Sequence, residues 1–452
     1  MWDLEGKIIG ATTDQGSNYK KAMSMYEDIS EINWVACCSH KIQLCINKAL
    51  DETPDAQAVI DKCHTISKFY RGGGFSTDLL MKHQRRLYDK TFKLLSMNAT
   101  RWNSRYTMAA RVLRVSGAIV ECHKELERTN HLKGEAGKAV LDSLVLTEDD
   151  IATLQEIIDF LGPAADFTNW AGKLASPTIS LIYSRVHSML PPEETFATKA
   201  VRDLHASMSE FIKKAWPLET MPKAMLLSVF LNPAIASDPL FRTTDYWDGK
   251  TLFVKSKEIA AEVVSEFMEK EHKAKMEAYK LEASREAEAR REAEARSQEA
   301  EARREAEASS QEASDEDQLP MKQDESPGDN TLSPGTALDS LYSKSYFDVL
   351  ARMPVDAYGV LVLGMSKQFE KYRGCPQEFW SKYKYHSALG TLGRVARAYL
   401  TIQATSTESE RLFSKAGLIL GDMSTALSDQ NLKNIIFLHS FEKLEALGIK
   451  LH

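Results

Sequence analysis

Two carboxylates stand in settings that suit a divalent cation, and Asp14 is the first. It ends the run Gly6 to Asp14 (GKIIGATTD), whose β-branched residues predict a short strand, and it precedes Gly16 and a helical stretch. An aspartate at the carboxyl end of a strand, before a glycine turn, is well placed to bind Mg²⁺. The alternative interpretation is a turn or helix N-cap aspartate without a metal.

Glu410 is the second carboxylate, within the segment ATSTESERLFSKAG that begins at residue 404. Thr407-x-x-Glu410 and the overlapping Thr405-x-x-Glu408 both have the capping-box pattern. A short helix ended by Gly417 would follow. Its buried face would consist of Leu412, Phe413 and Ala416. A glutamate in the first turn of a helix can also face a cation, so the structural and metal-binding interpretations are compatible.

A tryptophan among basic residues suggests contact with nucleic acid. Arg101 and Trp102 lie between residues 62 and 114, a segment with 12 basic and 2 acidic residues. Trp102 could stack on an unpaired base while Arg101 contacts a phosphate. A buried tryptophan beside a snorkelling arginine is the alternative. A second basic group consists of Lys82, Arg85 and Arg86. It could be a stripe of phosphate contacts or a weak nuclear import signal, and the alternative is a solvated helix face.

Cysteine usage and hydropathy narrow the class of protein. The chain has 452 residues, six sparse cysteines and a net charge of −7, and its cysteines and histidines lack the standard pairing of a zinc site. We therefore expect a reducing compartment, the cytosol or nucleus. No run of about 18 apolar residues occurs, so we expect no membrane span, and the first residues lack the pattern of a signal peptide.

The elements that must position these residues are first α/β and then helical. A strand at 6–14, a helix at 18–28, a strand at 34–38 and a helix at 40–50 predict part of an α/β layer. Residues 61–267 are mostly of helical pattern, and Gly162-Pro163 is expected to break the helix that contains residues 151–160. The turn expected at Leu231-Asn232-Pro233 lies in the same region.

A charged low-complexity stretch separates the two ends of the chain. Residues 281–330 hold 16 acidic and 7 basic side chains, and residues 283–313 contain no Leu, Ile, Val, Phe or Met. Such a sequence cannot form a coiled-coil seam. It is either a solvated single helix or disordered, and a disordered linker is expected at 314–334. A compact domain resumes near residue 337.

Three motifs together resemble the hAT family of transposases. Residues 404–417 and Asp429 to Phe441 (DQNLKNIIFLHSF) closely resemble its C-terminal dimerisation region. The segment TTDQGSN, followed by Cys37 and His40 of a Cys-x-x-His motif, is similar to the family's RNase H-like core. TRWNS, at residues 100–104, is similar to a motif whose tryptophan stabilises a flipped or hairpin DNA end.

The resemblance implies roles for the acids and a domain plan. Asp14 and Glu410 would be the second and third metal-binding carboxylates, but only Asp3 and Glu5 precede Asp14, so the first is expected to be missing. The expected domains are a partial RNase H-like α/β core at 1–60, a helical insertion at 61–270, a charged helix or disordered linker at 271–336, and a dimerisation region completing the core at 337–452. The chain as a whole is expected to be predominantly helical.

The function expected from this resemblance and from the missing first carboxylate is dimerisation in the nucleus, with residual DNA binding and no catalysis. The expected partners are a second copy of the chain and DNA, with no cofactor unless an active site binds Mg²⁺. The expected dimerisation residues are Leu412, Phe413, Leu432, Ile435, Ile436, Leu438 and Phe441. Two alternatives stay open. The chain could be a fragment of an active transposase that uses a two-metal carboxylate site for strand cleavage and transfer, or a purely helical scaffold without the two strands.

Overall fold

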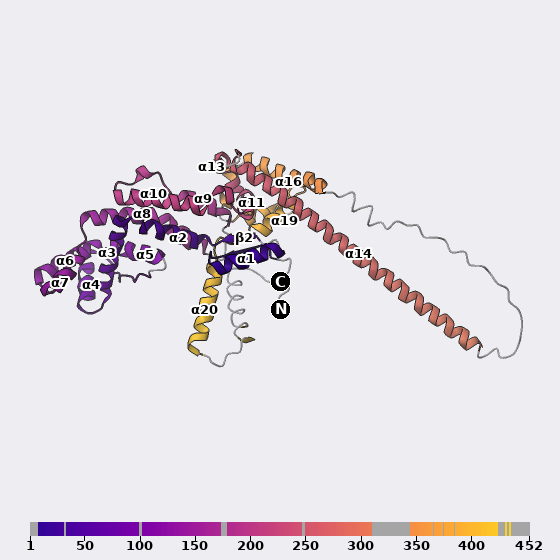
Figure 1. Ribbon diagram of the computed structural model, residues 1–452, viewed down its shortest axis with the longest axis horizontal. Helices are drawn as coiled ribbons and strands as arrows, with labels where there is room; N and C mark the ends of the chain where they lie inside the picture. The colour runs from indigo at the N-terminus through magenta and orange to yellow at the C-terminus, as the bar shows by residue number, and fades with distance from the viewer. Residues whose placement is uncertain are drawn as a thin grey trace. The chain divides into compact units, whose positions relative to one another are not determined.

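The chain is predominantly helical, with one small sheet (Figure 1). A computed structural model describes residues 8–30, 33–98, 102–172, 179–245, 249–309, 344–364, 366–373, 375–383, 385–423, 430–431 and 434. It divides into two compact units. Unit 1 comprises Met1–Lys257, Leu361–Tyr383 and Ala396–His452, and unit 2 comprises Glu258–Val360 and Lys384–Val395.

The sheet consists of two parallel strands, β1 (Gly10–Thr13) and β2 (Asn33–Ala36). Gly10 pairs with Asn33 and Thr13 pairs with Ala36, so the carboxyl ends of both strands lie at one end of the sheet. Helix α1 (Ser17–Ser30) connects the strands and α2 (Cys38–Asp51) follows β2. The predicted strand–helix–strand–helix order is therefore confirmed, with shorter strands than expected, and the purely helical alternative is wrong.

Unit 1 continues as a group of packed helices. The helices that follow α2 are α3 (Pro54–Arg71), α4 (Phe75–Leu87), α5 (Trp102–Arg114), α6 (Ser116–Thr129), α7 (Gly134–Ser143), α8 (Glu148–Ala171) and α10 (Lys199–Ala215). Helices α3, α5 and α8 pack against one another, and α10 packs on α2. Large buried side chains fill the interior, among them Tyr70, Trp102 and Phe160.

Helix α8 corrects one expectation from the sequence. It runs without interruption through Gly162 and Pro163 to Ala171, so the predicted break is wrong. Pro163 is exposed, which leaves its ring on the solvent side, where a helix can bend to accommodate it. Phe160, Leu161 and Ala164 are buried on either side of the Gly-Pro pair, and their packing outweighs the local preference.

The remaining elements of unit 1 are short. They are η1 (Ile179–Leu181), α9 (Ile182–Ser188), η2 (Glu193–Thr195), η3 (Leu218–Thr220), α11 (Lys223–Leu231), α12 (Pro233–Ala236), α13 (Pro239–Thr243), α17 (Ser366–Phe369), η4 (Glu370–Tyr372), α18 (Pro376–Lys382) and α20 (Thr407–Met423). Asn232 ends α11 and caps α12, which confirms the turn expected there.

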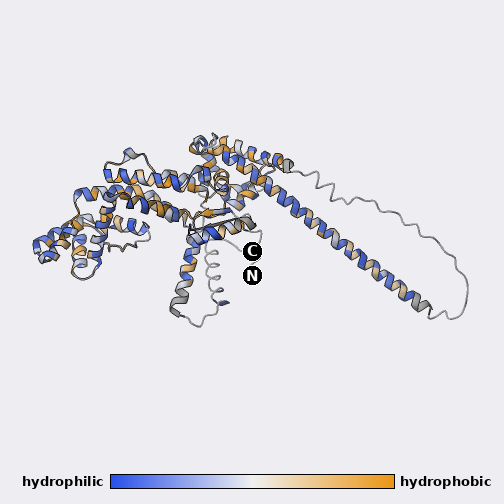
Figure 2. Ribbon diagram, in the orientation of Figure 1, coloured by the Kyte–Doolittle hydropathy of each residue, from blue (hydrophilic) through white to orange (hydrophobic). Residues whose placement is uncertain are grey.

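Unit 2 is built on parts of three helices, α14 (Leu252–Ser309), α16 (Lys344–Gly364) and α19 (Gly390–Tyr399). Within it, Arg394 forms an ion pair with Glu271, and Ser265 Oγ donates a hydrogen bond to Asp348 at 2.7 Å. Beyond residue 276 the described side chains of α14 are exposed, and hydrophilic residues recur along the helix (Figure 2). As far as Ser309, the low-complexity stretch is therefore a solvated helix; residues 314–334 lie outside the described part.

Candidate functional site

The Asp14 carboxylate closes the turn that follows β1. It is half-buried, and its Oδ1 accepts a hydrogen bond from the Gly16 amide at 2.8 Å. The Gly16 carbonyl then accepts a hydrogen bond from the Lys20 amide at 3.0 Å, at the start of α1. One oxygen of Asp14 is thus used in a local turn, the structural interpretation that the sequence had allowed.

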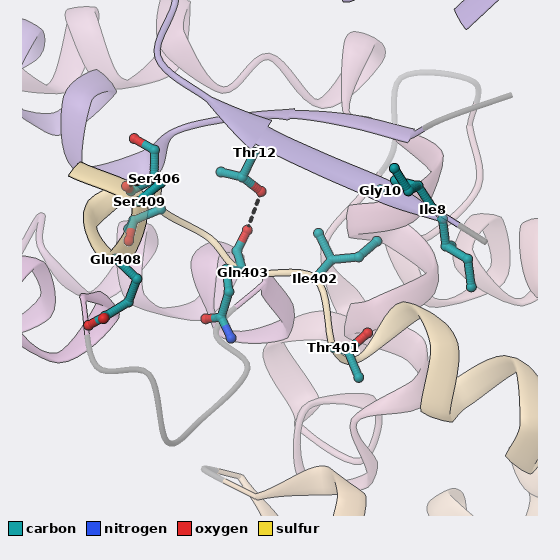
Figure 3. Close-up of a pocket in the computed structure, with 11 residues that line it drawn as sticks. Ile8, Gly10, Thr12, Thr401, Ile402, Gln403, Ser406, Glu408 and Ser409 are labelled. Carbon is teal, nitrogen blue, oxygen red and sulfur yellow. Dashed lines mark hydrogen bonds between the residues drawn. The ribbon is translucent and has the colours of Figure 1, made fainter. Parts of the chain in front are cut away.

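Residues 401–406 lie against the sheet in the structure, although they are far from its two strands in the sequence. Thr12 Oγ1 donates a hydrogen bond to the Gln403 carbonyl at 2.6 Å (Figure 3), and the Cys38 amide donates to the Ala404 carbonyl at 2.8 Å. Cys37 Sγ accepts a hydrogen bond from the Ser406 amide at 3.4 Å. The Cys-x-x-His motif therefore helps to fix this segment beside β2, through buried Cys37, while His40 is half-buried in the first turn of α2.

Glu410 lies in the first turn of α20 and is exposed. Its Oε1 accepts a hydrogen bond from Ser406 Oγ at 2.8 Å, and its amide donates to the Ser406 carbonyl at 3.1 Å. The expected capping box with Thr407 is therefore wrong, because Glu410 reaches the residue that precedes the helix. Since Ser406 contacts Cys37, just past β2, Asp14 and Glu410 both belong to segments at the carboxyl end of the sheet.

These two carboxylates do not on their own fit a two-metal centre. Such a centre holds two cations about 4 Å apart and needs several oxygen ligands that converge on them. Over the described ranges, no group of three or more His, Cys, Asp or Glu side chains converges in that way. Asp3 and Glu5 lie outside the described residues.

A cavity of about 430 Å³ opens between β1 and residues 401–409 (Figure 3). Its lining includes Ile8, Gly10 and Ile402, together with the polar Ser406 and Glu408. Among the described lining residues Glu408 is the one charged side chain, and it forms an ion pair with Arg411. Asp14 and Glu410 do not line the cavity, so it is not a pocket around the two candidate metal ligands.

Trp102 is buried at the start of α5, with 2% of its surface exposed. Its ring centroid lies 6.1 Å from that of Tyr106, and its indole nitrogen has no hydrogen-bond partner among the described residues. The indole is therefore part of the helical core and does not present a face to a base in this conformation. Arg101 lies outside the described residues.

The basic residues of α4 differ in their surroundings. Lys82 Nζ forms an ion pair with Glu125 at 2.7 Å, and this hydrogen bond lowers the pKa of the Glu125 carboxyl. Arg85 and Arg86 are exposed. Lys82 is also exposed, but its charge is partly neutralised by Glu125, whereas no ion pair with another described residue involves Arg85 or Arg86.

A further pair of basic residues, Arg111 and Arg114 of α5, was not singled out from the sequence. The Arg114 guanidinium lies 3.9 Å from the ring centroid of Phe92, and that of Arg111 lies 5.3 Å from it. Buried Gln84 holds Phe92 in place, because it accepts a hydrogen bond from the Phe92 amide at 2.7 Å and donates one to its carbonyl at 3.0 Å. The i, i+3 spacing of the two arginines was the available signal.

Comparison with known protein families finds a match for one region of the chain. Residues 370–441 match the hAT family C-terminal dimerisation region. The chain belongs among the hAT transposase-derived proteins. No curated protein matches the sequence. The dimerisation region implies self-association. Among the described helices, none combines the length and apolar character needed to cross a lipid bilayer.

The first part of the hAT region is anchored in unit 1. Trp380 is 1% exposed, and its indole nitrogen donates a hydrogen bond to the Leu231 carbonyl at 2.8 Å. Asn232 Nδ2 donates to the Arg373 carbonyl at 3.0 Å. These bonds join Arg373 and Trp380 to the end of α11 and the start of α12, so this part of the matched segment is integrated into the fold of unit 1.

Helix α20 presents an aromatic side chain to solvent. Phe413 is 73% exposed, Leu412 is half-buried and Ala416 is buried. The expectation that Phe413 is buried within the chain is wrong, and so is the expected end at Gly417, because α20 continues to Met423. The other expected dimerisation residues, Leu432, Ile435, Ile436, Leu438 and Phe441, lie outside the described residues and stay predictions.

Proposed function

We propose that this protein acts mainly by self-association through its hAT region and does not catalyse DNA strand transfer. The observation that carries the proposal is the match of residues 370–441 to the family's dimerisation region. The exposed Phe413 of α20 supports it, because it lies within the matched region and aromatic side chains are enriched in protein–protein interfaces.

Helix α16, which precedes the matched region, adds further support. Val349, Met353 and Val360 are 63%, 68% and 73% exposed. Their spacings of four and seven residues place them on one face of the helix. Contact with a second subunit would remove this apolar face from water, and each fully buried side chain of this kind contributes about 1.5–3 kcal/mol.

The mass of the full-length chain in solution tests self-association. Light scattering after size-exclusion chromatography should give a dimer or a larger assembly for the wild type. Phe413→Asp should weaken the assembly by at least about tenfold, since it places a charge in an apolar contact. Tyr279→Asp is the matched control, because Tyr279 is a 67% exposed aromatic residue of α14 outside the matched region. A monomeric wild type would contradict the proposal, as would equal effects of the two substitutions in variants with native circular dichroism.

A cleavage assay tests the absence of catalysis. Incubated with terminal-repeat-like DNA and Mn²⁺, the folded wild type and its Asp14→Asn and Glu410→Gln variants should all leave the DNA intact. Cleavage by the wild type that both substitutions abolish would instead establish the alternative function, strand cleavage by an active transposase. That outcome would leave self-association unaffected.

Contact with DNA is a second proposed function, supported by Arg111 and Arg114. Their guanidinium groups are held against Phe92 in the segment with 12 basic and 2 acidic residues. Positive charges fixed by packing can contact phosphates with little further loss of side-chain entropy. We propose that this basic surface, together with Arg85 and Arg86, contributes sequence-independent DNA binding.

Salt titrations of DNA affinity test this function. Fluorescence anisotropy with a short duplex should show weaker binding as salt rises, with a slope of about −0.9 per phosphate contact. Arg114→Gln should weaken binding and make the slope shallower by about one. Arg128→Gln, at an exposed position in the last turn of α6, is the control. An unchanged slope in Arg114→Gln would argue against the proposed surface.

We also propose that the protein acts in the nucleus, on the basis of the KHQRR segment. Within it, His83 and Gln84 are buried, so only part of the segment is accessible in the folded chain. Imaging of the full-length chain fused to a fluorescent protein tests the proposal. The fusion should accumulate in the nucleus, and replacing both Arg85 and Arg86 by alanine should reduce that accumulation. A fusion that stays in the cytoplasm would contradict it.

A further inference from the structure

Lys41, which has no carboxylate partner among the described residues, lies in the wall of an aromatic cavity in unit 1. Lys41, in the first turn of α2, donates a hydrogen bond from Nζ to the Ala215 carbonyl at 2.8 Å. Its Nζ lies 5.1 Å from the ring centroid of Trp216. Both contacts orient the ammonium group, but neither supplies a negative charge. An ammonium group has three N–H donors, so two remain after the bond to Ala215.

The cavity beside Lys41 has a volume of about 360 Å³, within the range of small-molecule pockets. Its walls include Trp34, Trp216, Met221 and Met225, together with Gln15 just past the end of β1. Trp34 is fixed in place, because its indole nitrogen donates a hydrogen bond to Thr13 Oγ1 at 3.0 Å. The cavity thus combines an apolar, aromatic lining with one positioned cation, at the end of a parallel sheet where ligands commonly bind.

The surrounding charges leave this cation uncompensated. Among the described residues that line the cavity none is Asp or Glu, and Lys41 is the one charged side chain. Burial lowers the pKa of Lys41; the nearby Cys38 and Cys45 act in the opposite direction, and Lys20 adds a smaller lowering effect, with a lower pKa as the result. A partly buried ammonium group with no counter-ion is unfavourable, and an anion that accepts its remaining hydrogens would relieve that cost. The charge therefore selects for anions and against cations.

We propose that this cavity binds a small aromatic anion. The ring contacts the indoles of Trp34 and Trp216, and a carboxylate or phosphate group accepts hydrogen bonds from Lys41. The aromatic and methionine side chains of the lining suit contact with the ring of such a ligand. This site involves neither Phe413 nor the arginines beside Phe92, so it is independent of self-association and of DNA binding.

Calorimetric titration of the full-length protein with 1-naphthoate tests the proposal, with the uncharged 1-naphthalenemethanol as the comparison ligand. Naphthoate should bind with a stoichiometry of one per chain and at least about tenfold more tightly than the alcohol, since only the anion engages Lys41. Lys41→Met should remove this preference, and Lys41→Arg should retain it. Lys48→Met is the matched control, because Lys48 lies on the same helix against Phe211 and does not line the cavity.

Two outcomes would overturn the inference. One is equal affinity for naphthoate in the wild type and in a folded Lys41→Met variant. The other is the absence of saturable binding by naphthoate, indole-3-acetate and phenyl phosphate to the folded wild type. Loss of calorimetric naphthoate binding in a folded Trp216→Leu variant would instead place the ligand in this cavity.

Discussion

Asp150 shows how one side chain can carry several interactions at a helix start. It belongs to the capping box of α8, in which Asp150 Oδ2 accepts from the Thr147 amide at 2.9 Å and the Asp150 amide donates to Thr147 Oγ1 at 3.1 Å. The same carboxylate accepts a hydrogen bond from Lys62 Nζ at 2.6 Å. Burial alone would raise the pKa of Asp150, but the hydrogen bonds from Lys62 and Thr147 outweigh it and lower the pKa below 3.8.

Replacing Asp150 by asparagine should therefore reduce the free energy of unfolding by about 1–2 kcal/mol at pH 7. Because the folded-state pKa is the lower one, the contribution of Asp150 is complete well above pH 3.8 and is lost as the pH falls through the folded-state value. Urea unfolding at pH 7 and pH 3 should show a smaller difference between wild type and variant at the lower pH. Asp149→Asn, an exposed neighbour in the same turn, should have little effect at either pH.

At the scale of elements, the docking of residues 401–406 on β1 depends on the absence of a side chain at Gly10. A Cβ atom there would lie 2.7 Å from Ile402 Cδ1 and 3.2 Å from the Asn33 carbonyl oxygen. Gly10→Ala should therefore destabilise unit 1 by about 1–3 kcal/mol through overpacking.

A second substitution makes that prediction specific. Ile402→Val removes the Cδ1 atom and should recover part of the stability lost in Gly10→Ala, so the two effects should not be additive. Thermal unfolding of both single variants and the double variant measures the coupling. Strict additivity would show that residue 402 does not pack against β1.

Some of this architecture could be predicted from local sequence and some could not. The β-branched residues of β1 and the apolar spacing of α2 were sufficient to place the sheet and its helices. Pro163 led to the wrong prediction of a helix break, because packing by Phe160 and Ala164 overrides its local helix-breaking preference. Gly417 led to the wrong prediction of a helix end, because a glycine inside a helix lowers its stability by only about 1 kcal/mol relative to alanine. The cavity beside Lys41 brings together residues near positions 15, 34, 41 and 216, a proximity that only the tertiary structure shows.

At the scale of the whole molecule, the charged part of α14 should contribute little to the stability of either unit. Its described side chains from residue 283 to 304 are exposed, so they bury no apolar surface within the chain. Deleting residues 283–309 should lower the helical circular dichroism signal and change the free energy of unfolding by less than about 0.5 kcal/mol. Val264→Asp, at a buried position of the same helix, should instead destabilise unit 2 strongly. Unfolding of the shortened chain at a clearly lower temperature would contradict the prediction.

The hydrogen bond between Thr12 and Gln403 also has a consequence for biosynthesis. It joins residues 391 positions apart. At translation rates of about 5–20 residues per second, β1 would leave the ribosome roughly 20–80 s before its partner segment is made. During that interval Gly10 and Thr12 of β1 lack the segment that packs beside them in the folded chain. Nascent chains should therefore be substrates for chaperones, and ribosomes that stall before codon 401 should yield products that aggregate or are degraded.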